Sequence, residues 1–258
     1  MHSLFWGDAQ TCTIPHKDKA FVDLCQQLRQ ENGLTNITVN HQVHGIDGSF
    51  IGHKDICAHT LRQAQGERQS YQDKHACNQI QSTPGINYLT RDGDFLITDQ
   101  PHVGIGVLTA DCLPIMVHAP DQNVAAAIHA GWRGSVGGIV DVVIKALADT
   151  SSAKCDAIQV YLGPSAHACC YQVQELFLDN FDTKAKDLCF AQRDGKIYFD
   201  LPLYNTLRLL DCGIKKEHID TTNSVCTICN NRYHSYRRMA GNDTGMRQLS
   251  MIWLNKKS

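Results

Sequence analysis

The stretch LTADCLPIMVHAPDQNVAAAIHAGWRGS, which runs from Leu108 to Ser135, carries the clearest structural signals in the chain. Two apolar runs, Pro114–Ala119 and Asn123–Ala130, flank the segment APDQN, whose proline and aspartate are typical of a tight turn. The two runs therefore predict a β-hairpin. The expected neighbours across its strands are Met116 and Val117 on one side and Ala126 and Ala127 on the other.

Two further apolar runs, Asp94–Thr98 and Gly104–Ala110, precede the hairpin, and we expect all four runs to be adjacent strands of one sheet. After Gly134, apolar residues recur at spacings of three and four, which predicts a helix with Ser135 as its N-cap. The apolar face of this helix comprises Val136, Ile139, Val140, Val143, Ile144 and Leu147.

The flanking sequence adds helices and strands on both sides. Lys19–Asn32 predicts an amphipathic helix closed by Gly33, and Asn36–Gly45 predicts a strand. The other expected elements are the strands Ile158–Gly163, Ile197–Leu201 and Leu249–Leu254 and the helices Gln174–Phe181 and Leu203–Cys212. From about His53 to Asn87 the chain is polar and rich in glutamine, so we interpret this segment as a long surface loop or an insertion.

Length and composition restrict the class of protein. The 258 residues suffice for one large domain or two small ones. Because the sequence has no sharp boundary, it predicts a single α/β (α+β) domain over residues 1–258, with mixed sheets flanked by helices. The formal charge is −2 and the basic residues are scattered, which favours a small substrate over nucleic acid or a membrane surface. The N-terminus MHSLFWGDAQTC resembles no export signal, so we expect a cytoplasmic protein whose 12 cysteines are reduced.

Polar side chains lie where the predicted strands end. Cys112 and His129 each sit between an apolar run and a turn, and His44 lies near the end of the earlier strand. Strand ends meet at one rim of a sheet, and two imidazoles with one thiolate form a ligand set of catalytic zinc sites. The alternative interpretation is a small core cysteine beside histidines that bind backbone atoms.

Three charged residues are further candidates for the site. Arg133 immediately precedes the predicted helix, whose N-terminus favours an anion, and an exposed arginine is the alternative interpretation. Asp111 and Asp94 are candidates either for contact with a substrate or for bracing the backbone and a histidine.

Six motifs occur in order along the chain. They are QVHG (Gln42–Gly45), GDFLIT (Gly93–Thr98), LTADCLPI (Leu108–Ile115), HAGWRG (His129–Gly134), GPSAHACCYQV (Gly163–Val173) and SYRR (Ser235–Arg238). Together they resemble the YfiH-type family, whose members are also called laccase-domain or polyphenol-oxidase-like proteins, purine nucleoside phosphorylases and peptidoglycan editing factors. The chain departs from that family in a short N-terminal segment without a TRxGG motif and in a longer Gln-rich stretch.

The resemblance implies a YfiH-like α/β fold and a zinc ion held by His44, Cys112 and His129. It also implies phosphorolysis of adenosine, inosine, guanosine and 5′-methylthioadenosine, with adenosine deamination as a second activity, or a role in correcting cell-wall precursors. Phosphorolysis needs a cradle for phosphate. Candidate residues for this cradle are Arg133 first and Arg237 and Arg238 second.

Three other functions would use the same residues. A copper oxidase follows from an older family name, yet multicopper centres need closely spaced histidines, and none of the 13 histidines has another two positions away. Copper is then an alternative or artefactual metal at Cys and His ligands. A cysteine hydrolase would use Cys112 as nucleophile and His129 as base. A non-enzymatic interaction module would tolerate loss of all three donors.

Two further features have competing interpretations. The C-x-x-C of Cys226–Cys229 could hold a second metal together with Cys169–Cys170. Adjacent cysteines should point in different directions, so we favour reduced core thiols at these positions. Trp132 and Tyr171 either stack on a purine or pack beside the site.

Overall fold

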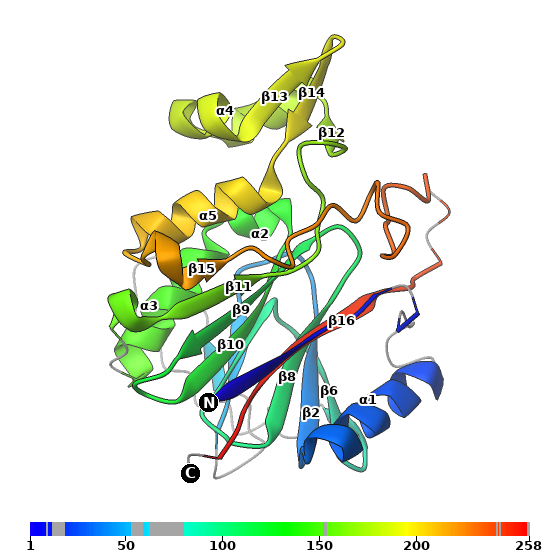
Figure 1. Ribbon diagram of the computed structural model, residues 1–258, viewed down its shortest axis with the longest axis vertical. Helices are drawn as coiled ribbons and strands as arrows, with labels where there is room; N and C mark the ends of the chain where they lie inside the picture. Colours follow the sequence, from blue (N-terminus) through cyan, green and yellow to red (C-terminus); the bar gives the residue numbers. More distant parts are fainter. Residues whose placement is uncertain are drawn as a thin grey trace.

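Two β-sheets packed face to face form the centre of the molecule, and helices cover their outer faces (Figure 1). The computed structural model describes residues 1–8, 10–11, 19–52, 59–61, 80–151, 154–240, 242 and 244–256. Apolar clusters lie between the two sheets and between each sheet and its helices. The order of layers is therefore helix, sheet, sheet, helix.

The first sheet has six strands in the order β1-β16-β8-β2-β6-β5. Their bounds are β1 His2–Trp6, β2 Asn36–His41, β5 Ile80–Thr83, β6 Ile86–Asp92, β8 Val103–Thr109 and β16 Gln248–Leu254. β1 pairs antiparallel with β16, so strands from the two ends of the chain lie side by side (Figure 1). β2 runs parallel to both β6 and β8.

The second sheet has seven strands in the order β15-β11-β9-β10-β7-β3-β4. Their bounds are β3 Gly48–Ile51, β4 His59–Leu61, β7 Phe95–Thr98, β9 Leu113–Ala119, β10 Val124–Ala130, β11 Gln159–Leu162 and β15 Ile219–Asp220. β9 and β10 form the expected hairpin, with Ala126 opposite Val117 and Ala127 opposite Met116. The hairpin prediction is confirmed.

Helices and a small third sheet complete the fold. α1 (Lys19–Asn32) packs on the six-stranded sheet, whereas α3 (Ile139–Ser151) and α5 (Leu201–Asp211) pack on the seven-stranded sheet. The small sheet β12-β14-β13 projects at one end together with α4 (Figure 1). The remaining bounds are α2 Trp132–Val136, α4 Thr183–Cys189, β12 Gln172–Val173, β13 Phe190–Arg193, β14 Lys196–Phe199 and the 3-10 helices Cys155–Ala157, Glu175–Asn180 and Lys216–His218.

Three links carry the chain from the six-stranded to the seven-stranded sheet at one shared edge. The parallel strands β2, β6 and β8 continue into β3, β7 and β9 through residues 42–47, 93–94 and 110–112. β10 runs antiparallel to both β7 and β9, so it ends at the same edge. The links and the end of β10 contain the polar residues that the sequence singled out.

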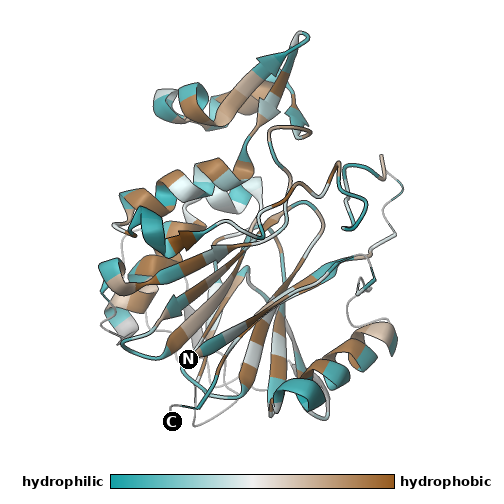
Figure 2. Ribbon diagram, in the orientation of Figure 1, coloured by the Kyte–Doolittle hydropathy of each residue, from teal (hydrophilic) through white to brown (hydrophobic). Residues whose placement is uncertain are grey.

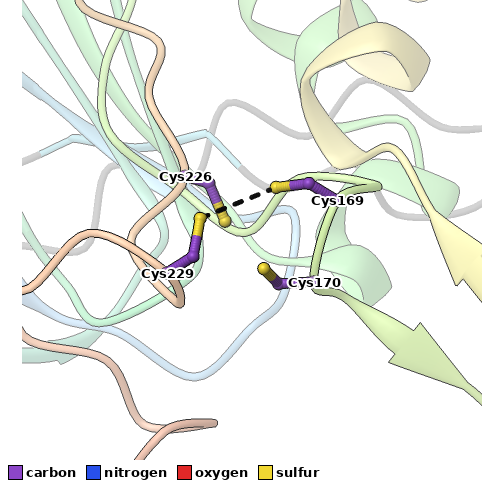
Figure 3. A group of neighbouring side chains, drawn as sticks. All are labelled: Cys169, Cys170, Cys226 and Cys229. Atoms are coloured by element: carbon purple, nitrogen blue, oxygen red, sulfur yellow. Dashed lines mark hydrogen bonds between the residues drawn. The ribbon is translucent and has the colours of Figure 1, made fainter.

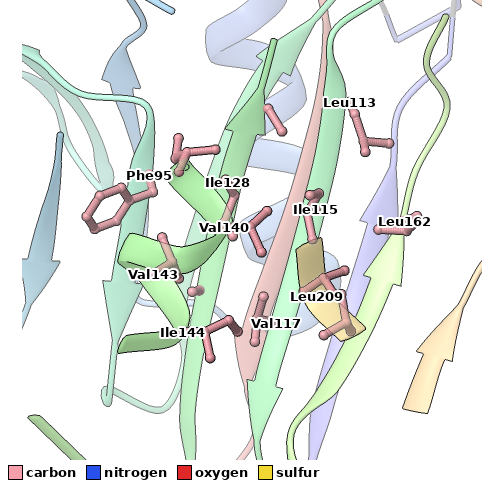
Figure 4. Close-up of a cluster of buried hydrophobic side chains, with 14 of the residues drawn as sticks. Phe95, Leu113, Ile115, Val117, Ile128, Val140, Val143, Ile144, Leu162 and Leu209 are labelled. Carbon is pink, nitrogen blue, oxygen red and sulfur yellow. The ribbon is translucent and has the colours of Figure 1, made fainter. Parts of the chain in front are cut away.

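Strand alternation divides the core. In β10, Ala125 and Ala127 face the other sheet, whereas Ala126 and Ile128 face the helices. Small alanines on the inner face let the two sheets approach, and larger side chains meet α3 and α5 on the outer face (Figure 4). Figure 2 shows hydrophobic residues concentrated in the strands, whereas the helices alternate hydrophobic and hydrophilic residues.

The prediction of a mixed α/β fold with flanking helices is confirmed, and two detailed predictions are wrong. β8 lies in the six-stranded sheet, so the four apolar runs are not neighbours in one sheet; buried runs reveal burial but not the partner strand. The helix expected after Gly134 is instead two helices, because Gly137 and Gly138 interrupt it and Gly138 has a φ of 85°. Arg133 therefore lies inside α2 and not before the helix.

Other elements shift in type or in their bounds. The strand that begins at Asn36 ends at His41, so His44 lies in a link. Glu175–Asn180 forms a 3-10 helix, not the α-helix expected over Gln174–Phe181. The Gln-rich segment contains β4, β5 and the start of β6, and its residues 53–58 and 62–79 lie outside the described part of the chain. Within the described residues, no helix has the length and apolar character that crossing a bilayer requires.

We expect Leu209→Ala to lower the free energy of unfolding by about 2–5 kcal/mol, because Leu209 of α5 is fully buried against the seven-stranded sheet. Leu176→Ala is the matched control: Leu176 is 77% exposed, so the same deletion should change stability by less than about 0.5 kcal/mol. Urea unfolding followed by circular dichroism measures both variants. Equal destabilisation by the two substitutions would contradict this description of the core.

Candidate metal centre

Three potential metal ligands converge at the edge where the links cross between the sheets. The donor atoms of His44, Cys112 and His129 all lie within 4.8 Å of one another. The rings of the two histidines meet edge to face, with their centroids 4.9 Å apart. His44 and Cys112 come from the links 42–47 and 110–112, and His129 comes from the end of β10. The structure thus brings together the three donors that the sequence singled out.

The Asp94 carboxylate orients two of these three residues. It accepts hydrogen bonds from His129 Nδ1 at 2.7 Å and from the backbone N–H groups of His44 at 2.9 Å and Gly45 at 2.7 Å. Because Asp94 occupies Nδ1 of His129, Nε2 is the ring nitrogen left for a metal. Burial opposes ionisation of Asp94, but these hydrogen bonds outweigh it and lower the pKa of the carboxyl group.

Strand register explains why Asp94 and His129 meet. Phe95 and Ile128 form the last pair of the β7–β10 ladder; Asp94 immediately precedes Phe95, and His129 immediately follows Ile128. The His129 N–H donates to the Asp94 carbonyl at 2.7 Å. Asp94 has no exposed surface. This geometry favours the bracing role for Asp94 over contact with a substrate.

Gln42 attaches the link that carries His44 to strand β8. Its side-chain amide donates to the Leu108 carbonyl at 2.8 Å and accepts from the Leu108 N–H at 2.7 Å. His44 itself has a φ of 63°, a conformation that costs a residue other than glycine about 1–3 kcal/mol. The hydrogen bonds from this link to Asp94 offset that strain.

Asp111 braces the outer wall of the site. Its carboxylate accepts hydrogen bonds from the Thr227 hydroxyl and from the Arg237 N–H, both at 2.6 Å. Its carbonyl accepts from the Ala166 N–H at 2.8 Å, and its φ is 85°. Both carboxylate oxygens thus have protein donors, which favours bracing over contact with a substrate.

Cys112 and His129 stabilise each other's charged forms. Burial opposes ionisation of the Cys112 thiol, but the imidazoles of His129 and His44 outweigh it and lower its pKa to about 6. Burial also disfavours the His129 cation, whereas the Cys112 thiolate and Asp94 raise the pKa of His129 to about 9. In the metal-free protein a thiolate therefore faces an imidazolium at neutral pH. The thiolate is the form of cysteine that binds metals and attacks electrophiles.

Gly131 leaves room for the donors. A Cβ atom at this position would lie 2.8 Å from the His44 ring and 3.1 Å from the Cys112 sulfur. Any other residue would displace one of the two, which explains the glycine in HAGWRG.

The three donors line a pocket of about 510 Å³ whose wall contains three arginines. Arg133 stacks on Trp132 with its guanidinium 4.5 Å from the ring centroid, and Arg237 stacks on Tyr171 at 4.7 Å. The third, Arg247, was missed by the sequence reasoning. These guanidinium groups make the pocket suitable for an anion.

Arg238 has a different environment. Its guanidinium donates to the backbone carbonyls of Thr227 at 2.7 Å and Ile228 at 3.0 Å and also to that of Tyr233. It is not among the residues that line the pocket. The structure therefore favours a structural role for Arg238 over the phosphate contact expected from the sequence.

Trp132 and Tyr171 line the pocket and also pack beside it. Trp132 meets Phe177 edge to face at 4.9 Å, and Tyr171 is buried against Phe177 and Phe199. An arginine stacks on each of the two rings. Burial raises the pKa of Tyr171 to about 12, so its hydroxyl stays protonated at neutral pH.

Several lining residues were not predicted as site residues: Asn40, His41, Gln42, Leu108, Ala110, Leu201, Tyr236 and Arg247. Four of them belong to the motifs QVHG, LTADCLPI and SYRR, namely Gln42, Leu108, Ala110 and Tyr236, so a signal existed for these four. Arg247 follows SYRR in the chain and reaches the pocket only through the fold.

A second group of donors lies outside this pocket. The sulfur atoms of Cys169, Cys170, Cys226 and Cys229 all lie within 4.8 Å of one another (Figure 3). The expectation that adjacent cysteines point apart is wrong, because a tight turn, with the Cys170 N–H bonded to the His167 carbonyl at 2.9 Å, replaces extended backbone. Cys169 and Cys229 are exposed, so these two are not core thiols.

Two proteins named as enzymes are more than 30% identical to part of this chain. A purine nucleoside phosphorylase of Clostridium acetobutylicum is 34% identical over 155 residues, which are 57% of this chain and 61% of the relative. An adenosine deaminase from an unknown prokaryotic organism is 32% identical over 158 residues, which are 58% of each protein. These matches span about three fifths of the relatives' length.

The fold has a close counterpart among solved structures. The hypothetical protein YfiH of Bacillus licheniformis superposes with a TM-score of 0.72 at 20% identity, over 95% of this chain and 86% of that one. Residues 16–255 match the family described as multi-copper polyphenol oxidoreductase laccase. With the six motifs in their expected order and the three donors at one edge of the sheets, the chain belongs to this laccase-like family.

Proposed function

We propose that this protein is a zinc-dependent purine nucleoside phosphorylase, with adenosine deamination as a second activity. The observation that carries the proposal is the convergence of two imidazoles and one thiolate in a pocket walled by arginines. The names of the relatives, a purine nucleoside phosphorylase and an adenosine deaminase, support the same class of substrate.

The residues present fit a zinc ion. His44, Cys112 and His129 provide nitrogen and sulfur donors that zinc prefers, and three protein ligands leave a fourth position open. The hydrogen bond from His129 to a buried carboxylate is the usual support of a metal-binding imidazole. When bound, zinc supplies a Lewis acid beside the substrate.

Zinc fits these residues better than a multicopper centre does. Within the described part of the chain, the only other group of potential ligands consists of four cysteines, so one group alone contains histidine. A multicopper centre needs several histidine-rich sites close together. Copper bound at the single Cys/His site would be an alternative metal, because Cu²⁺ binds most such ligands more tightly than zinc.

The arginines provide the phosphate cradle that phosphorolysis requires. In this reaction the bond between ribose C1′ and the purine nitrogen breaks, a bond from C1′ to a phosphate oxygen forms, and the base leaves with the electron pair and takes up a proton. Arg133 and Arg237 can hold the phosphate dianion through charge-assisted hydrogen bonds. Their stacking on Trp132 and Tyr171 limits the movement of both guanidinium groups.

The pocket also suits a nucleoside in size and polarity. Its volume of about 510 Å³ lies within the range typical of small-molecule sites. Tyr236 is 48% exposed and lines the pocket, so its ring can contact a planar base. Bound phosphate, sugar and base would together cover the three donors.

The reaction is tested with metal-quantified protein, adenosine, and buffer with or without phosphate. We expect adenine and ribose 1-phosphate only when phosphate is present, and we expect Cys112→Ser to abolish both products because the metal is lost. Chromatography identifies the products. Cys155→Ser, which alters another half-buried thiol outside the site, is the matched control and should retain activity. Inosine formed without phosphate would show deamination, and absence of every product would overturn the proposal.

Asp94→Asn is expected to weaken zinc binding by about 10- to 100-fold. One carboxylate oxygen accepts from His129 Nδ1 and the His44 N–H and the other accepts from the Gly45 N–H, whereas an amide keeps only one accepting oxygen. Competition with a chelator measures the affinity. Asp92→Asn is the control, since this exposed carboxylate lies two residues away in the chain and pairs with His41 at 3.0 Å, outside the three donors. Equal affinities of the two variants would contradict the positioning role of Asp94.

The metal-free protein should show a pH-dependent reaction at Cys112. Because its pKa is lowered to about 6, the thiolate forms above that pH, and alkylation by iodoacetamide should reach half its maximal rate near pH 6. Mass spectrometry of the Cys112 peptide measures the rate. Cys212 is the internal control, because burial and Asp141 raise its pKa to about 12. A rise near pH 8.5, typical of free cysteine, would contradict the pairing with His129.

The cysteine-hydrolase alternative rests on the same thiolate and imidazolium. Zinc added before iodoacetamide separates the two functions. Protection of Cys112 by zinc supports the metal site, whereas alkylation of Cys112 without loss of metal supports the nucleophile.

A further inference from the structure

The four clustered cysteines come from two loops that are far apart in the sequence. Cys169 and Cys170 lie between β11 and β12, and Cys226 and Cys229 lie between β15 and β16. All four sulfur atoms face a common centre in Figure 3 and lie within 4.8 Å of one another. None of the four lines the pocket of the first site.

The spacing of the sulfur atoms matches a tetrahedral metal site. A zinc–sulfur bond of about 2.3 Å in a tetrahedron places the sulfurs about 3.8 Å apart. The Cys169 and Cys229 sulfurs are 3.9 Å apart. The C-x-x-C spacing of Cys226 and Cys229 is also a common ligand pattern of structural zinc sites.

Backbone contacts hold the two loops together without help from the sulfurs. The Ser165 N–H donates to the Val225 carbonyl at 3.0 Å, and the Thr227 N–H donates back to the Ser165 carbonyl at 2.8 Å. These bonds form a short bridge between Ser165 and Cys226. The fold itself therefore brings the two cysteine-bearing loops together through backbone contacts.

Ordinary core packing does not explain this arrangement. Core cysteines behave as small buried hydrophobic residues, yet Cys169 and Cys229 are exposed. A disulfide would engage only two sulfurs and would not require the other two to converge on the same point. Four thiols at one centre, two of them exposed, match the donor number of a closed metal site.

We infer that Cys169, Cys170, Cys226 and Cys229 bind a second divalent cation of the zinc class, distinct from the ion at the His44, Cys112 and His129 site. Four protein ligands leave no open position, so this ion is structural and takes no part in the reaction. The inference stands independently of the proposed function, since it concerns different residues.

The second ion would fix the outer wall of the pocket. Cys170 precedes Tyr171, and the loop that holds Cys226 and Cys229 continues to Arg237. Tyr171 and Arg237 stack on each other and line the pocket. Joining the two loops through a metal would thus hold both side chains in place.

The test is the metal content of the whole chain, purified under reducing conditions in the presence of Zn²⁺ and desalted. We expect two zinc ions per chain in the wild type, one in Cys112→Ser and one in Cys229→Ser. Cys155→Ser is the matched control and should retain two. Co²⁺ distinguishes the sites, because the intense red-region absorption of a tetrahedral tetrathiolate complex should persist in Cys112→Ser and disappear in Cys229→Ser.

A conservative variant guards against misfolding. Cys229→His keeps a zinc ligand at this position, so it should restore the second ion and change the cobalt spectrum to that of a three-sulfur, one-nitrogen site. The inference is overturned if reduced Cys112→Ser protein binds no Zn²⁺ or Co²⁺. It is equally overturned if the Cys229→Ser variant binds as much metal as the wild type. If only the His44, Cys112 and His129 site binds no metal, the wild type and Cys112→Ser should each hold one zinc ion per chain. That result would leave the four-cysteine site intact.

Discussion

The hydrogen bonds to the Asp94 carboxylate are the interaction on which the site depends. One buried side chain receives the ring of His129 from β10 and two consecutive N–H groups from the link that carries His44. Backbone hydrogen bonds join the same segments, with the Asp94 N–H donating to the Asp47 carbonyl and the His129 N–H donating to the Asp94 carbonyl, both at 2.7 Å. A buried carboxylate needs such donors, since without them its charge would be strongly destabilised. The site therefore provides the hydrogen-bond donors that the buried Asp94 carboxylate needs, and Asp94 in turn positions His129 and the link that carries His44.

The crossing of the chain between the two sheets explains why polar residues gather at this edge. Three parallel strands of one sheet end together, and each link that leaves them must turn sharply into the other sheet. His44 and Asp111 adopt left-handed backbone conformations in two of these links. Strained backbone conformations are common at functional sites. They persist only where surrounding contacts hold them in place. Here the same hydrogen bonds that maintain the turns also aim the side chains at the pocket.

The pocket combines donors from the sheets with a wall made of later loops. Asp111 connects the two, since its carboxylate binds Thr227 and the backbone of Arg237 while Cys112 follows it in the chain. A displacement of the outer loops would therefore be transmitted to the candidate metal ligands. Contacts that hold the two cysteine-bearing loops together therefore also help to keep the candidate metal ligands in position.

Periodicity and local motifs sufficed to predict the hairpin β9–β10 and helix α1 and to single out His44, Cys112 and His129, because these signals lie within short stretches of the chain. Tertiary structure alone decided which sheet each buried strand joined, since a run buried on both faces fits either sheet equally well. It also decided that Arg247 reaches the pocket while Arg238 binds carbonyls, and that four cysteines from two distant loops converge. Those outcomes depend on contacts between segments far apart in the chain, and spacing along the sequence does not encode such contacts.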